Sequence, residues 1–163
     1  MRKINVGCAQ NLLDGWENID TQMYPDGNYE GKIFLQVDAR EYDYTNADMV
    51  LAGHFLEHLT REDGVTWIQR VSQQAPKCVL IIAIPAIDRS CHYCGHEMLQ
   101  IIASYPKDPY DEKTRGGSHS SLWRTKDLNN ELFNAGFKVI TEVPEHKLLT
   151  GIAKWQYAVE ATK

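Results

Sequence analysis

The sequence has no run of apolar residues long enough to cross a membrane. Its longest aliphatic run, Val79–Ile84, is far shorter than the roughly 20 residues that a spanning helix needs. It also has no excess of basic residues, because 17 Lys and Arg stand against 22 Asp and Glu and leave a net charge of −5. These two absences exclude a membrane-spanning helix and disfavour a nucleic-acid partner.

Cysteine is scarce, and the first residues do not resemble a leader peptide. The chain has four cysteines, and residues 1–7 hold no apolar stretch of the roughly 7–15 residues that a signal peptide needs. We therefore expect a cytoplasmic protein without stable disulfides. The length of 163 residues, with 43% hydrophobic and 24% charged residues, is typical of one globular domain.

Short β-rich segments recur along the chain, and most of them end at glycine, proline or aspartate. The segment Val79–Ile84 is continuously apolar rather than alternating, which is typical of a strand buried on both faces of a parallel sheet. The expected strands are Ile4–Val6, Glu17–Asp20, Ile33–Val37, Asp48–Ala52, Lys77–Ile84, Phe137–Val143 and Ala153–Ala161.

Helix signals lie between the later strands. Thr60 and Asp63 form a capping box before an amphipathic segment. Thr125 is expected to cap a second helix that stops at Gly136, and a short third helix is expected around 98–102. Strands that alternate with helices predict a doubly wound, Rossmann-like α/β fold with one seven-stranded, mostly parallel sheet.

The first two strand connections are short and have few helix signals. They comprise residues 7–16 and 21–32, and the second contains the turn sequence Pro25-Asp26-Gly27. A parallel crossover needs about 10–12 residues and usually holds a helix. We therefore expect reduced early helices and a partly uncovered sheet, which favours a homo-oligomer.

Residues suited to ligand binding directly follow four of the expected strands. Ligands of doubly wound sheets bind beyond the carboxyl ends of the strands. The small residues Gly7–Ala9 allow a ligand to approach the backbone closely. Asp20 and Asp38 offer carboxylates to a ribose diol and an exocyclic amine, and the fourth strand ends at Gly53-His54. The pattern predicts a nucleoside site, although each residue taken alone is also compatible with an ordinary strand end.

Three stretches then resemble, in the correct order, the class I S-adenosylmethionine-dependent methyltransferases. Ile4–Asp20 resembles the opening of that family, Ala47–Leu59 resembles its fourth strand and the turn after it, and His119–Phe137 resembles the segment before its sixth strand. The resemblance implies a methyltransferase with S-adenosylmethionine as its cofactor.

The resemblance also implies roles for the strand-end residues. Gly7, Cys8, Ala9 and Gln10 would face the methionine part and the ribose of the cofactor, Asp20 would bind the ribose hydroxyls, Asp38 and Ala39 would meet the adenine, and Gly53 would lie beside the sulfur.

Three residues after the fourth strand are candidates for catalysis. His54, Glu57 and His58 carry side chains that can take a proton from an attacking hydroxyl or amine, and His54 is the best placed under the family reading. The alternative is that His54 is a structural histidine at the entry to a helix. The spacing also matches the H-x-x-E-H zinc-protease pattern, but here the pattern begins at the end of a strand.

Some relatives, including the small-RNA 2′-O-methyltransferases, carry Glu-x-x-Glu-His after the fourth strand and a later histidine. The chain resembles that set through His54, Glu57, His58 and His119, which implies a divalent metal that lowers the pKa of an acceptor hydroxyl. Three imidazoles and one carboxylate suit zinc, iron or manganese better than magnesium. The alternative is that Glu57 and His58 cap the next turn and that His119 is a loop residue.

Residues 88–118 form a long insertion, which we expect to cover the active site and select the substrate. It contains Cys91-His92-Tyr93-Cys94-Gly95-His96, which fits either part of a zinc site or free cysteines beside surface histidines.

The combined prediction is one methyltransferase-like domain over residues 1–163. It would methylate a small-molecule or sugar acceptor at oxygen or nitrogen. The alternative is a non-catalytic module of the same fold that binds S-adenosylmethionine or a partner, favoured by Ala9, where the family usually has glycine, and by the short early loops.

Overall fold

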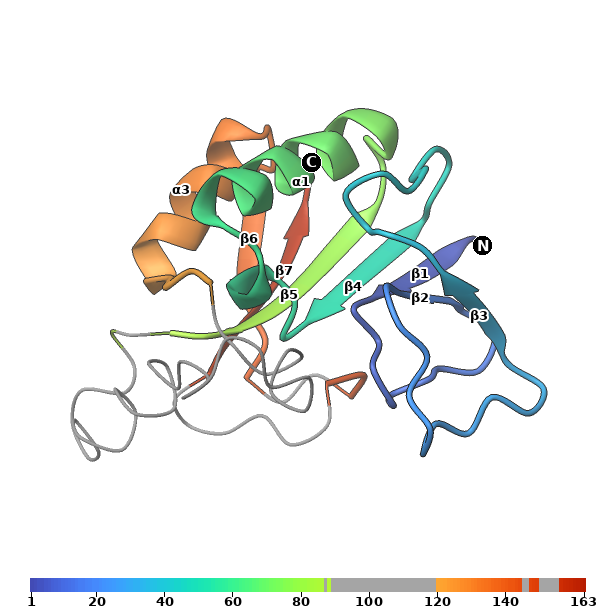
Figure 1. The fold of residues 1–163 in the computed structure, drawn as a ribbon. Helices are drawn as coiled ribbons and strands as arrows, with labels where there is room; N and C mark the ends of the chain where they lie inside the picture. Colours follow the sequence, from blue (N-terminus) through green and yellow to red (C-terminus); the bar gives the residue numbers. More distant parts are fainter. Residues whose placement is uncertain (87, 89–119, 145–146, 150–155) are drawn as a thin grey trace, which may run out of the picture.

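The computed structural model describes residues 1–86, 88, 120–144, 147–149 and 156–163. They form a seven-stranded sheet in the order β3-β2-β1-β4-β5-β7-β6 (Figure 1). The strands are β1 (Lys3–Val6), β2 (Glu17–Asp20), β3 (Ile33–Gln36), β4 (Met49–Gly53), β5 (Val79–Pro85), β6 (Val139–Glu142) and β7 (Gln156–Thr162).

The sheet is mostly parallel, as predicted. The strands β1 to β5 pair in parallel, whereas β7 lies antiparallel between β5 and β6. Strand β1 has β2 on one side and β4 on the other, so the strand order reverses there. The carboxyl ends of β1 and β4 therefore flank the crevice in which ligands bind in such sheets.

The helix α1 (Arg61–Gln74) and the one-turn 3-10 helix η1 (Leu56–His58) connect β4 to β5, and α3 (Thr125–Asn134) precedes β6. The predicted cap of α1 is confirmed, because the Asp63 amide donates to Thr60 Oγ1 at 3.1 Å. The predicted stop at Gly136 is also confirmed: α3 ends just before it, and Gly136 has a φ of +95°.

The predicted cap of α3 is wrong. Thr125 is the first residue of the helix, and Arg124 occupies the capping position without a side-chain hydrogen bond. The Thr125 amide and hydroxyl instead donate to the Asp88 carboxylate at 3.1 and 2.5 Å. A carboxylate from a distant segment thus satisfies an amide that the helix leaves unpaired, and its charge is favourable at this end. The third helix expected around 98–102 lies outside the described residues.

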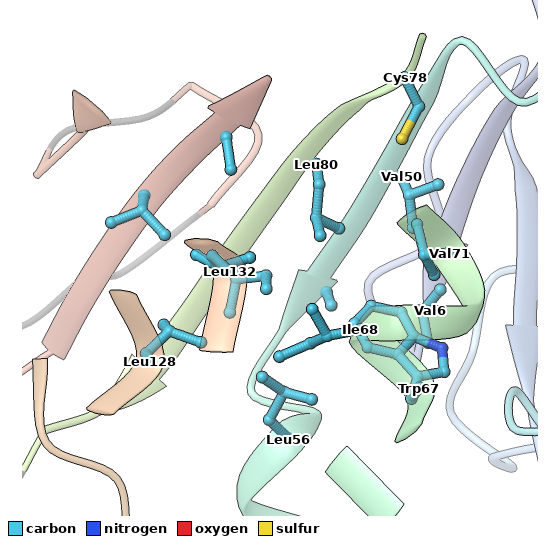
Figure 2. Packing of buried hydrophobic residues seen from close by; sticks show 14 of the residues in the cluster. Val6, Val50, Leu56, Trp67, Ile68, Val71, Cys78, Leu80, Leu128 and Leu132 are labelled. Atoms are coloured by element: carbon cyan, nitrogen blue, oxygen red, sulfur yellow. The ribbon is translucent and has the colours of Figure 1, made fainter. Parts of the chain in front are cut away.

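Both described α-helices pack on one face of the sheet (Figure 1). Figure 2 shows Trp67, Ile68 and Val71 of α1 beside Val6 and Val50, and it shows Leu128 and Leu132 of α3. The Trp67 indole donates to the buried hydroxyl of Tyr44 at 2.8 Å, and that hydroxyl donates to the Ala39 carbonyl, also at 2.8 Å. These bonds join the helix to the loop that follows β3.

Residues 7–32, which connect β1 to β2 and β2 to β3, contain no helix. The Asn18 side chain of β2 is fully buried and contacts several backbone groups of these connections. The two N–H groups of its Nδ2 are shared among the carbonyls of Leu13, Trp16 and Ile33, which lie 3.0–3.2 Å from the nitrogen. Its Oδ1 accepts from the Leu13 amide and from Asn5 Nδ2. The Asn18 side chain therefore links the β1–β2 loop to the sheet through hydrogen bonds. The prediction of reduced early helices is confirmed.

Within the described ranges, none of the helices has the length and apolar character needed to span a membrane.

Candidate cofactor and active site

A cavity of about 730 Å³ opens at the carboxyl ends of the strands. Its walls come from the carboxyl ends of β2 and β4 and the segments that follow β1, β2, β3 and β4, with Ala83 of β5, Ser120 and Leu149. The eight residues predicted to bind a cofactor all line it: Gly7, Cys8, Ala9, Gln10, Asp20, Asp38, Ala39 and Gly53. Residues widely separated in sequence thus meet at one edge of the sheet, as parallel strands require.

The β1–β2 loop is held in an uncommon backbone conformation. Gly7 has a φ of +60° and Ala9 one of +45°. The Gly7 amide donates to the Ile19 carbonyl at 2.9 Å, and the Ala9 amide donates to Asp20 Oδ2 at 2.9 Å. A Cβ at Gly7 would lie 3.0 Å from Cδ2 of Phe55, so only glycine fits here without a shift. Conformational strain held in place by such contacts is common at ligand sites.

Between these residues, the Cys8 thiol is buried. Burial, helped by the nearby charge of Asp20, raises the pKa of the Cys8 thiol to about 12. The thiol is therefore neutral at physiological pH, and Cys8 presents a small, uncharged surface to the cavity.

The Asp20 carboxylate organises two backbone segments at once. Besides accepting from Ala9, it accepts from the Gln22 amide at 3.3 Å through Oδ1. The β1–β2 loop and the start of the β2–β3 loop are therefore joined at a carboxylate that also lines the cavity.

The Asp38 carboxylate is bound by Arg40. It accepts from Nη2 of Arg40 at 2.6 Å, from Nε at 3.1 Å and from the Arg40 amide at 2.9 Å. The Arg40 hydrogen bonds lower the pKa of Asp38 below its ordinary value. Arg40 also pairs with Asp63 at 3.3 Å, which ties the loop after β3 to the first turn of α1. A ligand amine would therefore have to share the Asp38 carboxylate with a guanidinium.

His54 lines the cavity between two polar side chains. Its Nδ1 lies 3.0 Å from Glu57 Oε1, and its Nε2 lies 2.6 Å from Nε2 of Gln156, the first residue of β7. The backbone of His54 has a φ of +56°, and its amide donates to the Ala83 carbonyl at 2.9 Å. The imidazole is thus oriented from both sides.

The other two candidate catalytic residues have different positions. His58 lines the cavity, whereas Glu57 lies behind His54 and is 1% exposed. Glu57 Oε2 has no hydrogen-bond partner in the described part of the chain. The structure therefore places Glu57 as a residue that contacts His54 and not as one that lines the cavity.

The predicted metal ligands are only partly described. In the ranges that the structure covers, no three His, Cys, Asp or Glu side chains are grouped as metal ligands. His119 and the Cys91–His96 motif lie outside those ranges. The metal therefore stays a prediction.

Solved structures provide the comparison that decides the fold. An S-adenosylmethionine-dependent methyltransferase from Archaeoglobus fulgidus aligns with 99% of this chain and 86% of its own, with a TM-score of 0.66 and 17% identity. The magnesium protoporphyrin IX methyltransferase of Synechocystis PCC 6803, solved with bound S-adenosylhomocysteine, aligns with 100% of this chain and 74% of its own, with a TM-score of 0.62 and 14% identity. The chain has the class I methyltransferase fold.

Several other structures of this methyltransferase fold are longer. An O-methyltransferase family protein from Burkholderia thailandensis aligns over 99% of this chain and 51% of its own, with a TM-score of 0.64 and 13% identity. The chain spans about half the length of several such structures, between 50 and 52% of four of them. No family model and no curated protein sequence matches it.

Among the residues of this methyltransferase-like site that sequence reasoning missed, three differ in the signal that the sequence offers. Arg40 gives a weak signal, because it stands two positions after Asp38 in a turn. Tyr24 lines the cavity from the β2–β3 loop, and the turn sequence just after it was the only local cue. Gln156 gives no signal, because it reaches His54 from 102 positions away.

Proposed function

We propose that the protein is an S-adenosylmethionine-dependent methyltransferase that acts on a small-molecule or sugar acceptor, at oxygen or nitrogen. The observation that carries the proposal is the convergence of four strand ends on one cavity where the strand order reverses. Ligands bind at this place in doubly wound sheets.

The cavity fits a nucleoside cofactor. Its volume of about 730 Å³ lies within the roughly 300–1,000 Å³ typical of ligand pockets. Asp20 offers a carboxylate to a diol, and Gly7 allows close approach of the ligand to the backbone. In this proposal Gly7–Gln10 and Asp20 hold the methionine and ribose parts, and the Val37–Ala39 turn holds the adenine. When bound, S-adenosylmethionine supplies a methyl group activated by a sulfonium.

His54 is the proposed proton acceptor. With the Gln156 amide as donor to Nε2, the imidazole is neutral and its Nδ1–H donates to Glu57. An acceptor hydroxyl that took the place of the Gln156 amide would then be placed to give its proton to Nε2 of His54. The buried Glu57 carboxylate, 3.0 Å from Nδ1, would stabilise the imidazolium that forms.

Cofactor binding is tested by calorimetric titration with S-adenosylmethionine and S-adenosylhomocysteine. Asp20→Ala should weaken both by about five- to 150-fold, because ligand hydroxyls lose a charged partner. Asp20→Asn, which keeps the shape and one acceptor, should lose less. No heat and no thermal shift for the parent protein with either ligand would refute the proposal.

Turnover is tested on a panel of phenols, sugars and amines with labelled cofactor. His54→Asn keeps a residue that tolerates a positive φ, and it should lower turnover by about 10²- to 10⁴-fold with little change in cofactor affinity. Binding without turnover of any acceptor would instead favour the non-catalytic module.

A further inference from the structure

The β2–β3 connection, residues 21–32, is shaped by two tyrosines. The Tyr24 amide donates to the Tyr29 hydroxyl at 2.8 Å, and that hydroxyl donates to the Tyr24 carbonyl at 3.2 Å. A phenol has one proton to donate and an oxygen that accepts. Here both functions are used on the backbone of a single residue, so the Tyr29 side chain holds Tyr24 as a neighbouring strand would.

Tyr29 is itself held by its surroundings. Its ring meets the Phe34 ring of β3 edge-on, with centroids 5.0 Å apart and an interplanar angle of 75°. Gly27 lies directly against it, because a Cβ at that position would be 2.4 Å from Tyr29 Cε2. The Gly27 amide closes the turn on the Tyr24 carbonyl at 3.0 Å. The connection therefore has a defined shape although it contains no helix.

The hydrogen bonds with Tyr29 hold Tyr24, an aromatic residue, in the cavity wall. Tyr24 is half-buried and lines the cavity together with Asp20 and the Val37–Arg40 turn. The Val37 amide donates to the Asp20 carbonyl at 2.8 Å, so these segments are neighbours. Among the described lining residues the other phenyl-bearing side chain, Phe55, packs beneath Gly7 and against Trp67 instead.

We propose that Tyr24 stacks on the nucleobase of the cofactor and that Tyr29 is the positioning residue that holds it there. This inference rests on the proposed function. Stacking fits this end of the cavity because Arg40 already engages the Asp38 carboxylate, the group expected to bind the exocyclic amine. An aromatic face supplies affinity for a base without using its hydrogen-bonding edge.

The test measures the affinity for S-adenosylhomocysteine and for adenosine by calorimetry. Tyr24→Ala should weaken both ligands by about tenfold or more. Tyr24→Leu, which keeps apolar volume but lacks a planar face, should lose nearly as much, and Tyr24→Phe should bind as the parent does. Met23→Ala is the matched control, because Met23 is 58% exposed on the same connection and does not line the cavity.

A double-mutant cycle of Tyr24 and Tyr29 shows whether Tyr29 affects ligand affinity by positioning Tyr24 or by a general effect on stability. Tyr29→Phe removes only the hydroxyl, and it should weaken binding by about threefold or more in the parent but have no effect in the Tyr24→Ala background. Equal losses in both backgrounds would overturn the role of Tyr29. Unchanged affinity in both Tyr24→Ala and Tyr24→Leu would overturn the stacking role while the proposed function stands. A parent protein that binds neither ligand would refute the proposed function, and this inference with it.

Discussion

Replacing Gly7 by alanine tests the link between backbone conformation and the cavity. The new Cβ would lie 3.0 Å from Phe55 Cδ2 and 3.3 Å from Phe55 Cβ. The Phe55 ring rests edge-on against Trp67, with centroids 5.2 Å apart, so it has little room to move. Holding an L-residue at the φ of +60° costs about 1–2 kcal/mol, and overpacking adds about 1–3 kcal/mol. The free energy of unfolding should fall by about 2–5 kcal/mol in total.

Gly15 is a matched control in the same β1–β2 connection. Its φ is +70°, close to that of Gly7, but a Cβ there would meet no atom within 4 Å. Gly15→Ala should therefore lose only the conformational part, about 1–2 kcal/mol. The difference between the two variants isolates the contact with Phe55.

Urea unfolding followed by tryptophan fluorescence measures both losses, and titration with S-adenosylhomocysteine measures the effect on the cavity. Gly7→Ala should weaken ligand binding by about tenfold or more if the loop shifts to accommodate the methyl group, whereas Gly15→Ala should bind as the parent does. Equal losses of stability in the two variants would show that the Phe55 contact is unimportant and would refute this reasoning.

Three further predictions concern stability, and urea unfolding measures each of them. The Arg40 hydrogen bonds lower the pKa of Asp38 below 3.8, so their stabilising contribution is complete above that pH and is lost as the pH falls through the lowered value. Arg40→Gln should therefore reduce the free energy of unfolding by about 0.5 kcal/mol at pH 6, and the gap from the parent should close in acid; a gap that stays constant contradicts this. Asn18→Leu should destabilise by about 3 kcal/mol because it leaves the Leu13 amide and several carbonyls buried without partners, and a loss under about 1 kcal/mol would mean that water replaces the amide. Thr60→Ala should lose about 1 kcal/mol through the α1 cap, and no loss would mean that solvent caps the Asp63 amide equally well.

The strands and the strand-end residues could be predicted from sequence because their causes are local. A continuously apolar run such as Val79–Ile84 can be satisfied only between two covered faces, which predicts a central parallel strand. Once parallel strands are expected, their carboxyl ends must meet at one edge. The convergence of Gly7, Asp20, Asp38 and Gly53 on one cavity follows from that geometry.

Other features depend on contacts between residues far apart in the chain. Strand β7 lies antiparallel between β5 and β6, and this position brings Gln156 within hydrogen-bond distance of His54. No local sequence pattern predicts the contact between these two residues. The cap of α3 comes from Asp88, 37 positions before Thr125, because any carboxylate in reach satisfies an exposed helix amide.

The hydrogen-bond and ion-pair partners of charged groups were likewise not predictable from local sequence. From the sequence, Asp38 was expected to bind an exocyclic amine and Glu57 was a candidate catalytic residue. In the fold, Arg40 pairs with Asp38, and Glu57 is buried against His54. Hydrogen bonds and ion pairs act over a few ångströms, so the partner of each group is decided by which side chains the folded backbone brings within reach. Local patterns in the sequence determined the strands and the residues at their ends, and only tertiary packing determined which partners those polar residues have.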